Sequence, residues 1–206
     1  MTVPHMTSAP LPSPRPTPLV PYPGPSARAA LAWIGRYGDL DGDGYLEHRT
    51  RSSKGLVNQG WKDSWNSMLF ADGRVAEGPI AVCEVQGYAY DARLRAARLA
   101  RSIWNDTGLA DRLEADAALL RSRFNRDFWS ESRGHYVVAL DGQKHQVDAL
   151  TSNIGHLLWS GIVDPERAAR TVERLMAPDR FSGWGVRRMS ARDAGHHPTQ
   201  DHNGTG

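Results

Sequence analysis

The sequence is poor in cysteine, in long apolar runs and in clustered charge. One cysteine, Cys83, among 206 residues excludes an internal disulfide and fits a reducing compartment, so a cytoplasmic location is expected. No apolar stretch is long enough to span a membrane, and none near the N-terminus forms a signal peptide. The formal net charge is only +2 and the arginines are scattered, so nothing favours nucleic acid as a partner.

Proline is unevenly distributed, because most of the 13 prolines lie before residue 26. Proline lacks the amide donor and cannot continue a helix, so residues 1–25 are expected to form a disordered or polyproline head. The pattern therefore predicts two parts, the head and a folded domain at residues 26–206.

The folded part shows apolar residues at helical spacing, interrupted by short loops. The predicted helices start at Ser26, Pro79, Asp106, Thr151 and Asp164, with a small hairpin from His135 to Leu140. Helices joined by very short links are antiparallel neighbours, so the pattern predicts an all-α fold built from helical pairs.

An acidic turn follows the first predicted helix. Asp39, Asp41 and Asp43, followed by Gly44, match the first half of a calcium-binding loop. The twelfth position of such a loop is a bidentate glutamate, and here it is Thr50. The departure argues against an EF-hand and leaves a tight acidic turn, with or without a calcium ion.

The segment around Asp63 combines an acid with two indoles. Asp63 lies between Trp61 and Trp65, and a carboxyl held against apolar rings has a raised pKa, as a general acid requires. Planar rings also bind the faces of sugars, and Glu84 and Gln86 offer groups for the hydroxyls. Alternatively, both tryptophans are core residues and Asp63 caps a helix.

Five segments, in this order, carry a resemblance to a known family: GDLDGDGYLEH, GLVNQGWKDSW, CEVQGYAY, SNIGHLLWSGI and FSGWGVRRMS. The chain resembles the glycogen-debranching, amylo-alpha-1,6-glucosidase-like proteins of the six-hairpin glycosidases. The resemblance implies an (α/α)6 toroid and inverting hydrolysis of an α-glucosidic bond in an α-glucan or oligosaccharide. It implies Asp63 as the general acid, and it places the following residues around the sugar: Glu47, Asn58, Gln59, Glu84 and Gln86.

The chain also departs from the family pattern. Asn66 stands where the family usually has an acid, and the sequence stops at Gly206, just after His202-Asn203-Gly204. The expectation is an incomplete toroid, about half of the barrel, with the general acid present and the general base missing. Such a chain is expected to be inactive alone, and to self-associate or bind a partner that supplies the other half.

Two other functions remain open at this stage. One is a non-catalytic carbohydrate-binding remnant, and the other is a helical interaction module whose tryptophans are core residues. An exposed Trp61 or Trp65 beside Asp63 and Glu84 favours sugar, whereas two buried rings favour the interaction module.

Overall fold

The computed structural model describes residues 24–197, except residues 53, 57, 61 and 63. Its elements are, in order, helix α1 (Gly24–Tyr37), strand β1 (Ala81–Val82), helices α2 (Cys83–Ser102) and α3 (Thr107–Asp127), strands β2 (Trp129–Ser130), β3 (His135–Tyr136), β4 (Ala139–Leu140) and β5 (Gln146–Val147), the 3-10 helix η1 (Ser152–Gly155), and helices α4 (His156–Ser160) and α5 (Pro165–Leu175). The helical expectation is confirmed in the main, but five short strands in the described part correct the all-α assignment.

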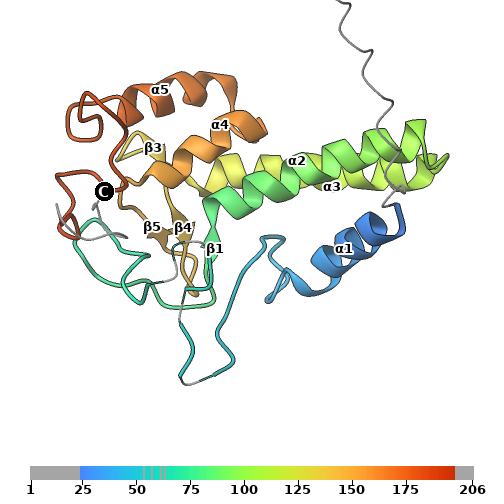
Figure 1. Cartoon of the computed structure of the whole chain (residues 1–206), viewed down its shortest axis with the longest axis horizontal. Coiled ribbons are helices and arrows are strands. Elements are labelled where there is room, and N and C mark those ends of the chain that lie inside the picture. The colour runs from blue at the N-terminus through green and yellow to red at the C-terminus, as the bar shows by residue number, and fades with distance from the viewer. Residues whose placement is uncertain (1–23, 53, 57, 61, 63, 198–206) are drawn as a thin grey trace, which may run out of the picture.

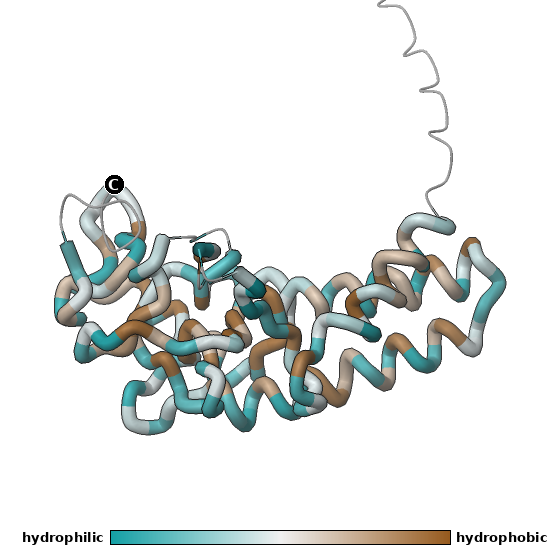
Figure 2. The backbone as a smooth tube through the Cα atoms, turned by 90° about the horizontal axis from the view of Figure 1, so that it is seen from below, coloured by the Kyte–Doolittle hydropathy of each residue, from teal (hydrophilic) through white to brown (hydrophobic). Residues whose placement is uncertain are grey.

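Helices α2 and α3 form a long antiparallel hairpin that extends from the body of the molecule (Figure 1). Asp106 ends the connection as predicted, because its carboxylate accepts the backbone N–H of Leu109 at 2.9 Å and caps α3. The buried side of α3 carries Leu113, Leu120 and Phe124 at helical spacing. Apolar and polar residues alternate along both helices (Figure 2), as expected of helices with one buried face.

Helix α1 packs beside this hairpin near its tip (Figure 1). Leu31 contacts a small alanine-rich cluster of α2 and α3, and Arg28 pairs with Asp106 at 2.7 Å. The helix begins at Gly24, which corrects the expected start at Ser26. Pro25 is compatible with this position, since the first turn of a helix needs no proline N–H.

The short strands pair at the base of the hairpin. Strands β1, β4 and β5 form an antiparallel sheet in that order, and β2 pairs with β3. Two hairpins therefore replace the single one expected: Asp141-Gly142 turns β4 into β5, whereas β3 pairs with the strand before it. The start of α2 is corrected from Pro79 to Cys83, because Ile80 pairs with His48 and β1 pairs with β4.

The main core lies where the sheets meet α3, η1 and α4. An aromatic group joins these layers: Phe124 stacks on Phe128 at 4.5 Å and on Tyr136 at 5.4 Å, and Trp129 meets Tyr136 edge-on. The predicted short helix after Thr151 is confirmed as η1 and α4, and the helix after Asp164 is confirmed as α5. Within the described residues, no helix has both the length and the apolar character needed to cross a bilayer.

Candidate functional site

The candidate site is built around Glu84, in the first turn of α2. Strand β1 runs directly into this helix, and a carboxylate at a helix N-terminus is stabilised by the helix dipole. Glu84 is only 2% exposed. Asn153, at the start of the adjacent η1–α4 segment, donates from Nδ2 to Glu84 Oε1 at 2.6 Å, and Cys83 Sγ contacts Oε2 at 3.4 Å. Thr151 in turn donates to Asn153 Oδ1 at 2.9 Å, so the amide is fixed before any ligand arrives.

Lys62 is the buried cation associated with this carboxylate. Burial lowers the pKa of Lys62 to about 8, and the negative charge of Glu84 opposes that shift. The sequence left open where this side chain points, and the structure buries it. A lysine held in this way remains mostly protonated at neutral pH and offsets the carboxylate charge.

Arg180 adds a second buried positive charge to the same region, because its charge contributes to lowering the pKa of Lys62. Its side chain is fully buried, and burial lowers the pKa of Arg180 itself to about 10. Among the described residues, none of its three guanidinium nitrogens has a hydrogen-bond partner. The region around Glu84 is therefore polar and strongly charged beneath its surface.

The structure describes only some of the site residues predicted in the segment around Asp63. Asp63 and Trp61 lie outside the described residues. Trp65 is 68% exposed, which is what sugar binding requires of it and what a core residue would not show. Gln59 is also exposed.

Asn58 lies buried and closes the loop that carries this segment. Its Nδ2 donates to the backbone carbonyl of Lys62 and to Ser67 Oγ, the latter at 2.8 Å. Ser67 Oγ also donates to the Lys62 carbonyl at 2.6 Å. These bonds give Asn58 a loop-shaping position, and its expected contact with sugar stays a prediction.

Gln86 and Glu47 do not share the partners of Glu84; both contact residues around the acidic turn or the segment after it. Gln86 accepts the backbone N–H of Leu46 at 2.9 Å and donates to the Leu46 carbonyl at 2.7 Å. Glu47 has a fully buried carboxylate that contacts Lys144 and accepts the backbone N–H of Leu40 at 3.2 Å. Both side chains thus fasten the segment after the acidic turn, and their expected roles around a sugar stay predictions.

The acidic turn holds a lysine where the motif suggested calcium. The ligand oxygens of Asp39, Asp41 and Asp43 lie within 4.8 Å of one another, a grouping able to hold a metal ion. Lys144 places its ammonium 2.8 Å from Asp41 and 2.7 Å from Asp43, and also contacts Glu47. These carboxylates raise the pKa of Lys144, so a permanent positive charge sits in the group.

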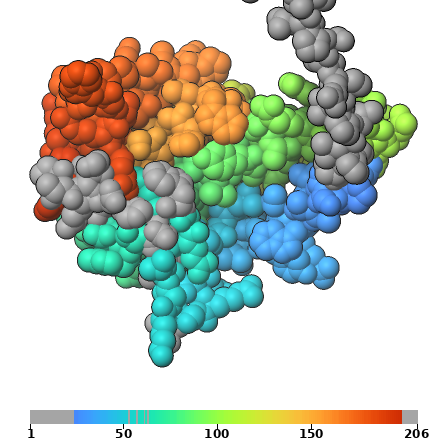
Figure 3. All heavy atoms as spheres, viewed as in Figure 1, coloured from blue at the N-terminus to red at the C-terminus, as the bar shows by residue number. Residues whose placement is uncertain are grey.

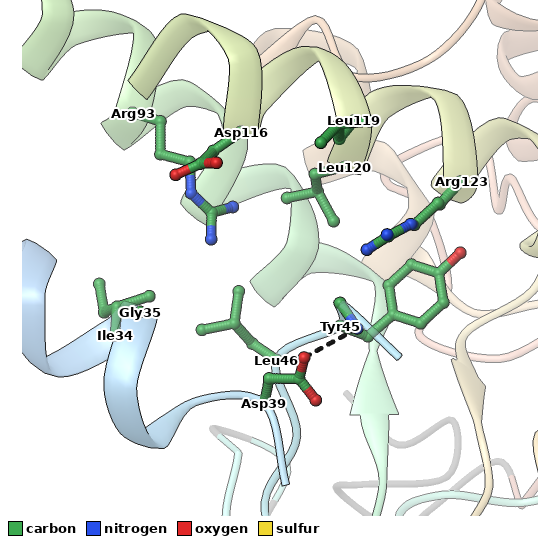
Figure 4. Close-up of a pocket in the computed structure, with 11 residues that line it drawn as sticks. Ile34, Gly35, Asp39, Tyr45, Leu46, Arg93, Asp116, Leu119, Leu120 and Arg123 are labelled. Atoms are coloured by element: carbon green, nitrogen blue, oxygen red, sulfur yellow. Dashed lines mark hydrogen bonds between the residues drawn. The ribbon is translucent and has the colours of Figure 1, made fainter. Parts of the chain in front are cut away.

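A cavity of about 200 Å³ lies beside this turn, between α1, α2 and α3. Figure 4 shows Arg93 and Arg123 reaching into it from α2 and α3, above Asp39 and Leu46. Neither Glu84 nor Asn153 lines this cavity, so it is separate from the candidate site.

Sequence reasoning missed two of the described contributors, Asn153 and Arg180. Asn153 was present in the segment SNIGHLLWSGI, and its position at the start of a predicted helix was an available signal. The sequence contains no comparable signal for Arg180, because arginines are mostly exposed in folded proteins and are therefore expected on the surface. Its burial depends on packing that only the structure contains.

No family model and no curated protein matches the chain. Among solved structures, a sialidase matches at a TM-score of 0.66 and 14% identity, over 88% of this chain and 16% of that one. Neutral trehalase Nth1 from Saccharomyces cerevisiae matches at a TM-score of 0.54 and 16% identity, over 66% of this chain and 26% of that one. The likeness is one of fold. Both names denote glycosidases, and the chain spans about a quarter or less of either.

These likenesses agree with the expected partial helical toroid. They do not confirm the debranching family that the motifs suggested. Substrate, linkage and activity are therefore matters for proposal.

Proposed function

We propose that this chain forms the sugar-binding part of a glycoside hydrolase that acts on α-glucans or related oligosaccharides. The observation that carries the proposal is the buried pair of Glu84 and Asn153 at the N-terminal ends of neighbouring helices. A carboxylate oriented by an amide, beside a lysine, is an arrangement suited to gripping sugar hydroxyls.

The chemistry of the pair supports binding by Glu84. A carboxylate offers about four lone-pair sites in all, and among the described residues Asn153 and Cys83 donate to Glu84. Bonds to a charged acceptor are stronger than neutral ones, which suits recognition of hydroxyl groups. The exposed indole of Trp65 provides a flat apolar surface two residues after the predicted acid in the sequence.

Asp63 is the proposed proton donor. In inverting hydrolysis, one carboxyl protonates the leaving oxygen while another, roughly 6.5–9.5 Å away, activates water. Glu84 is proposed as a ligand for the sugar and not as that second carboxylate, and we assign no general base. A partner or second copy that completes the toroid, as the motif comparison suggested, is part of this proposal.

A binding measurement tests the proposal directly. Isothermal titration of the 206-residue chain with maltotriose and isomaltotriose should detect binding, and Glu84→Gln should weaken it about tenfold or more, because a hydrogen bond to a charged group is lost. Glu131→Gln is the matched control, since Glu131 is an exposed acid that pairs only with Arg167 among the described residues. Equal affinities for wild type and Glu84→Gln, or no saccharide binding at all, would contradict the proposal.

The catalytic part has its own readout. In any preparation of this protein that hydrolyses an α-glucoside, Asp63→Asn should lower kcat by about 10²- to 10⁴-fold with little change in sugar affinity. Near-normal turnover in this variant would remove Asp63 from the role of proton donor.

A further inference from the structure

An exposed aromatic pair lies on the surface formed by α2 and α4. Tyr88 stacks on Trp159 with ring centroids 5.7 Å apart and ring planes inclined by 26°. Trp159 is 57% exposed and Tyr88 is 36% exposed, whereas Leu157 on the other side of α4 is fully buried. Two large aromatic rings therefore share one solvent-facing surface instead of entering the core.

His156 gives this pair a polar rim. Its Nδ1 lies 2.9 Å from the hydroxyl of Tyr88, and its ring meets the Tyr88 ring edge-on at 5.8 Å. The hydrogen bond and the stacking hold the Tyr88 ring from two sides. The surface is thus ordered before any ligand binds, with an apolar face and hydrogen-bonding groups at its edge.

The pair adjoins the Glu84 site along both helices. Tyr88 follows Glu84 by four residues on α2, which puts the two side chains on one helix face about one turn apart. Trp159 and His156 lie on the helix that follows Asn153. Figure 3 shows α4 and the first half of α2 next to each other on one face of the molecule. Burial raises the pKa of Tyr88, and the negative charge of Glu84 adds to that shift, which fits this proximity.

The size and chemistry of the surface favour a sugar over a protein. Two aromatic rings offer a contact area of a few hundred Å² at most, whereas a stable protein interface buries about 800 Å² of surface on each partner. A pyranose ring has one face of C–H groups and a rim of hydroxyls, which matches an aromatic face bordered by Tyr88 and His156. A second exposed pair, Trp33 and Tyr37 on α1, has no such carboxylate–amide pair beside it among the described residues.

We propose that Tyr88, Trp159 and His156 form a saccharide-stacking subsite next to the Glu84 site, which holds the pyranose unit adjacent to the one bound there. The subsite rests on the proposed function and extends it to substrates of at least two sugar units. One helical turn separates Glu84 from Tyr88, a spacing comparable to one sugar unit along an oligosaccharide.

Chain-length dependence is the readout that isolates the subsite. Glucose, maltose and maltotriose are titrated into the wild type and into Trp159→Ala, Trp159→Phe and Trp33→Ala, with circular dichroism as the check on folding. Wild type should bind maltotriose about tenfold more tightly than glucose, which corresponds to about 1.4 kcal/mol, a size that one aromatic stacking contact can supply. Trp159→Ala should lose that gain, Trp159→Phe should keep part of it, and the control Trp33→Ala should keep all of it.

The outcomes separate this inference from the function on which it rests. If Glu84→Gln weakens binding but Trp159→Ala leaves the gain intact, the subsite is disproved and the proposed function stands. If the wild type binds none of the sugars, the proposed function fails, and the subsite fails with it. If Trp159→Ala changes only the mass of the protein in solution, measured by light scattering, the surface is a protein contact and the inference is overturned.

Discussion

His135 is a buried histidine held neutral by its surroundings. It lies in β3, with ring Nδ1 2.8 Å from the backbone carbonyl of Tyr136, and burial lowers its pKa to about 4. The ring therefore stays uncharged in the folded protein at pH values where an ordinary histidine takes up a proton.

This shift makes the stability of the fold sensitive to mild acid. Between about pH 6.5 and pH 4 the unfolded chain binds a proton at His135 that the folded protein does not, so the free energy of unfolding falls as the pH drops through that window. The loss should reach the order of 3 kcal/mol at its acid end. Urea unfolding at several pH values measures it, and His135→Gln should remove this part of the slope while Ser132→Ala keeps it. An unchanged slope in His135→Gln would show that other groups control the acid response.

The buried polar residues mark how far single residues can be read from sequence. Glu84 and Gln86 sit among apolar neighbours, and burial of such groups requires partners. That requirement is visible in the sequence, but the partners are not. Gln86 bonds the backbone of Leu46, 40 residues away, and Glu84 bonds Asn153, 69 residues away. Only the folded arrangement decides which of the two faces the candidate site.

At the scale of elements, the acidic turn is an example of a motif completed by another part of the chain. Lys144 follows the turn between β4 and β5 and adopts a positive φ of 64°, an uncommon conformation for a residue with a side chain. Its ammonium neutralises carboxylates that a calcium ion would otherwise join. The sequence displayed the acids but gave no sign of a cation from a hairpin a hundred residues later.

Removing this lysine should make the turn respond to calcium. Lys144→Met should lower the free energy of unfolding by about 1–2 kcal/mol, because the carboxylates then repel one another without compensation. Added millimolar calcium should raise the Tm of the variant, since an ion that binds only the folded state stabilises it. Wild type and the exposed control Lys54→Met should show no such rise. A variant with unchanged Tm, with and without calcium, would show that Lys144 does not replace an ion here.

The helices were more predictable than the strands: a hairpin was expected at His135–Leu140, where β3 and β4 lie, but each of these strands pairs with a different partner. Helices α2, α3 and α5 have long apolar patterns with identifiable starts, and these survive in the structure with shifted ends. The strands are two residues long, and pairing with distant segments decides them, as with Ala81 and Leu140. No local pattern of two residues carries that information.

At the scale of the whole molecule, the chain is a helical assembly whose candidate site lies at one end of two neighbouring helices. Glu84, Asn153 and the aromatic pair Tyr88 and Trp159 all lie at this end. The tip of the α2–α3 hairpin, which carries Asn105, extends away from that end (Figure 1). A saccharide bound as proposed would therefore leave the tip of the hairpin untouched.

A nuclear magnetic resonance titration of asparagine side chains tests this placement most directly. The chain is labelled with ¹⁵N at asparagine and titrated with maltotriose, and the side-chain amide signals are followed. The signal of Asn153 should shift and saturate, because its amide bonds the carboxylate proposed to bind the sugar, while the signal of Asn105 should stay in place. Binding that moves Asn105 and leaves Asn153 unchanged, or a titration that moves neither, would contradict a saccharide site built on Glu84 and Asn153.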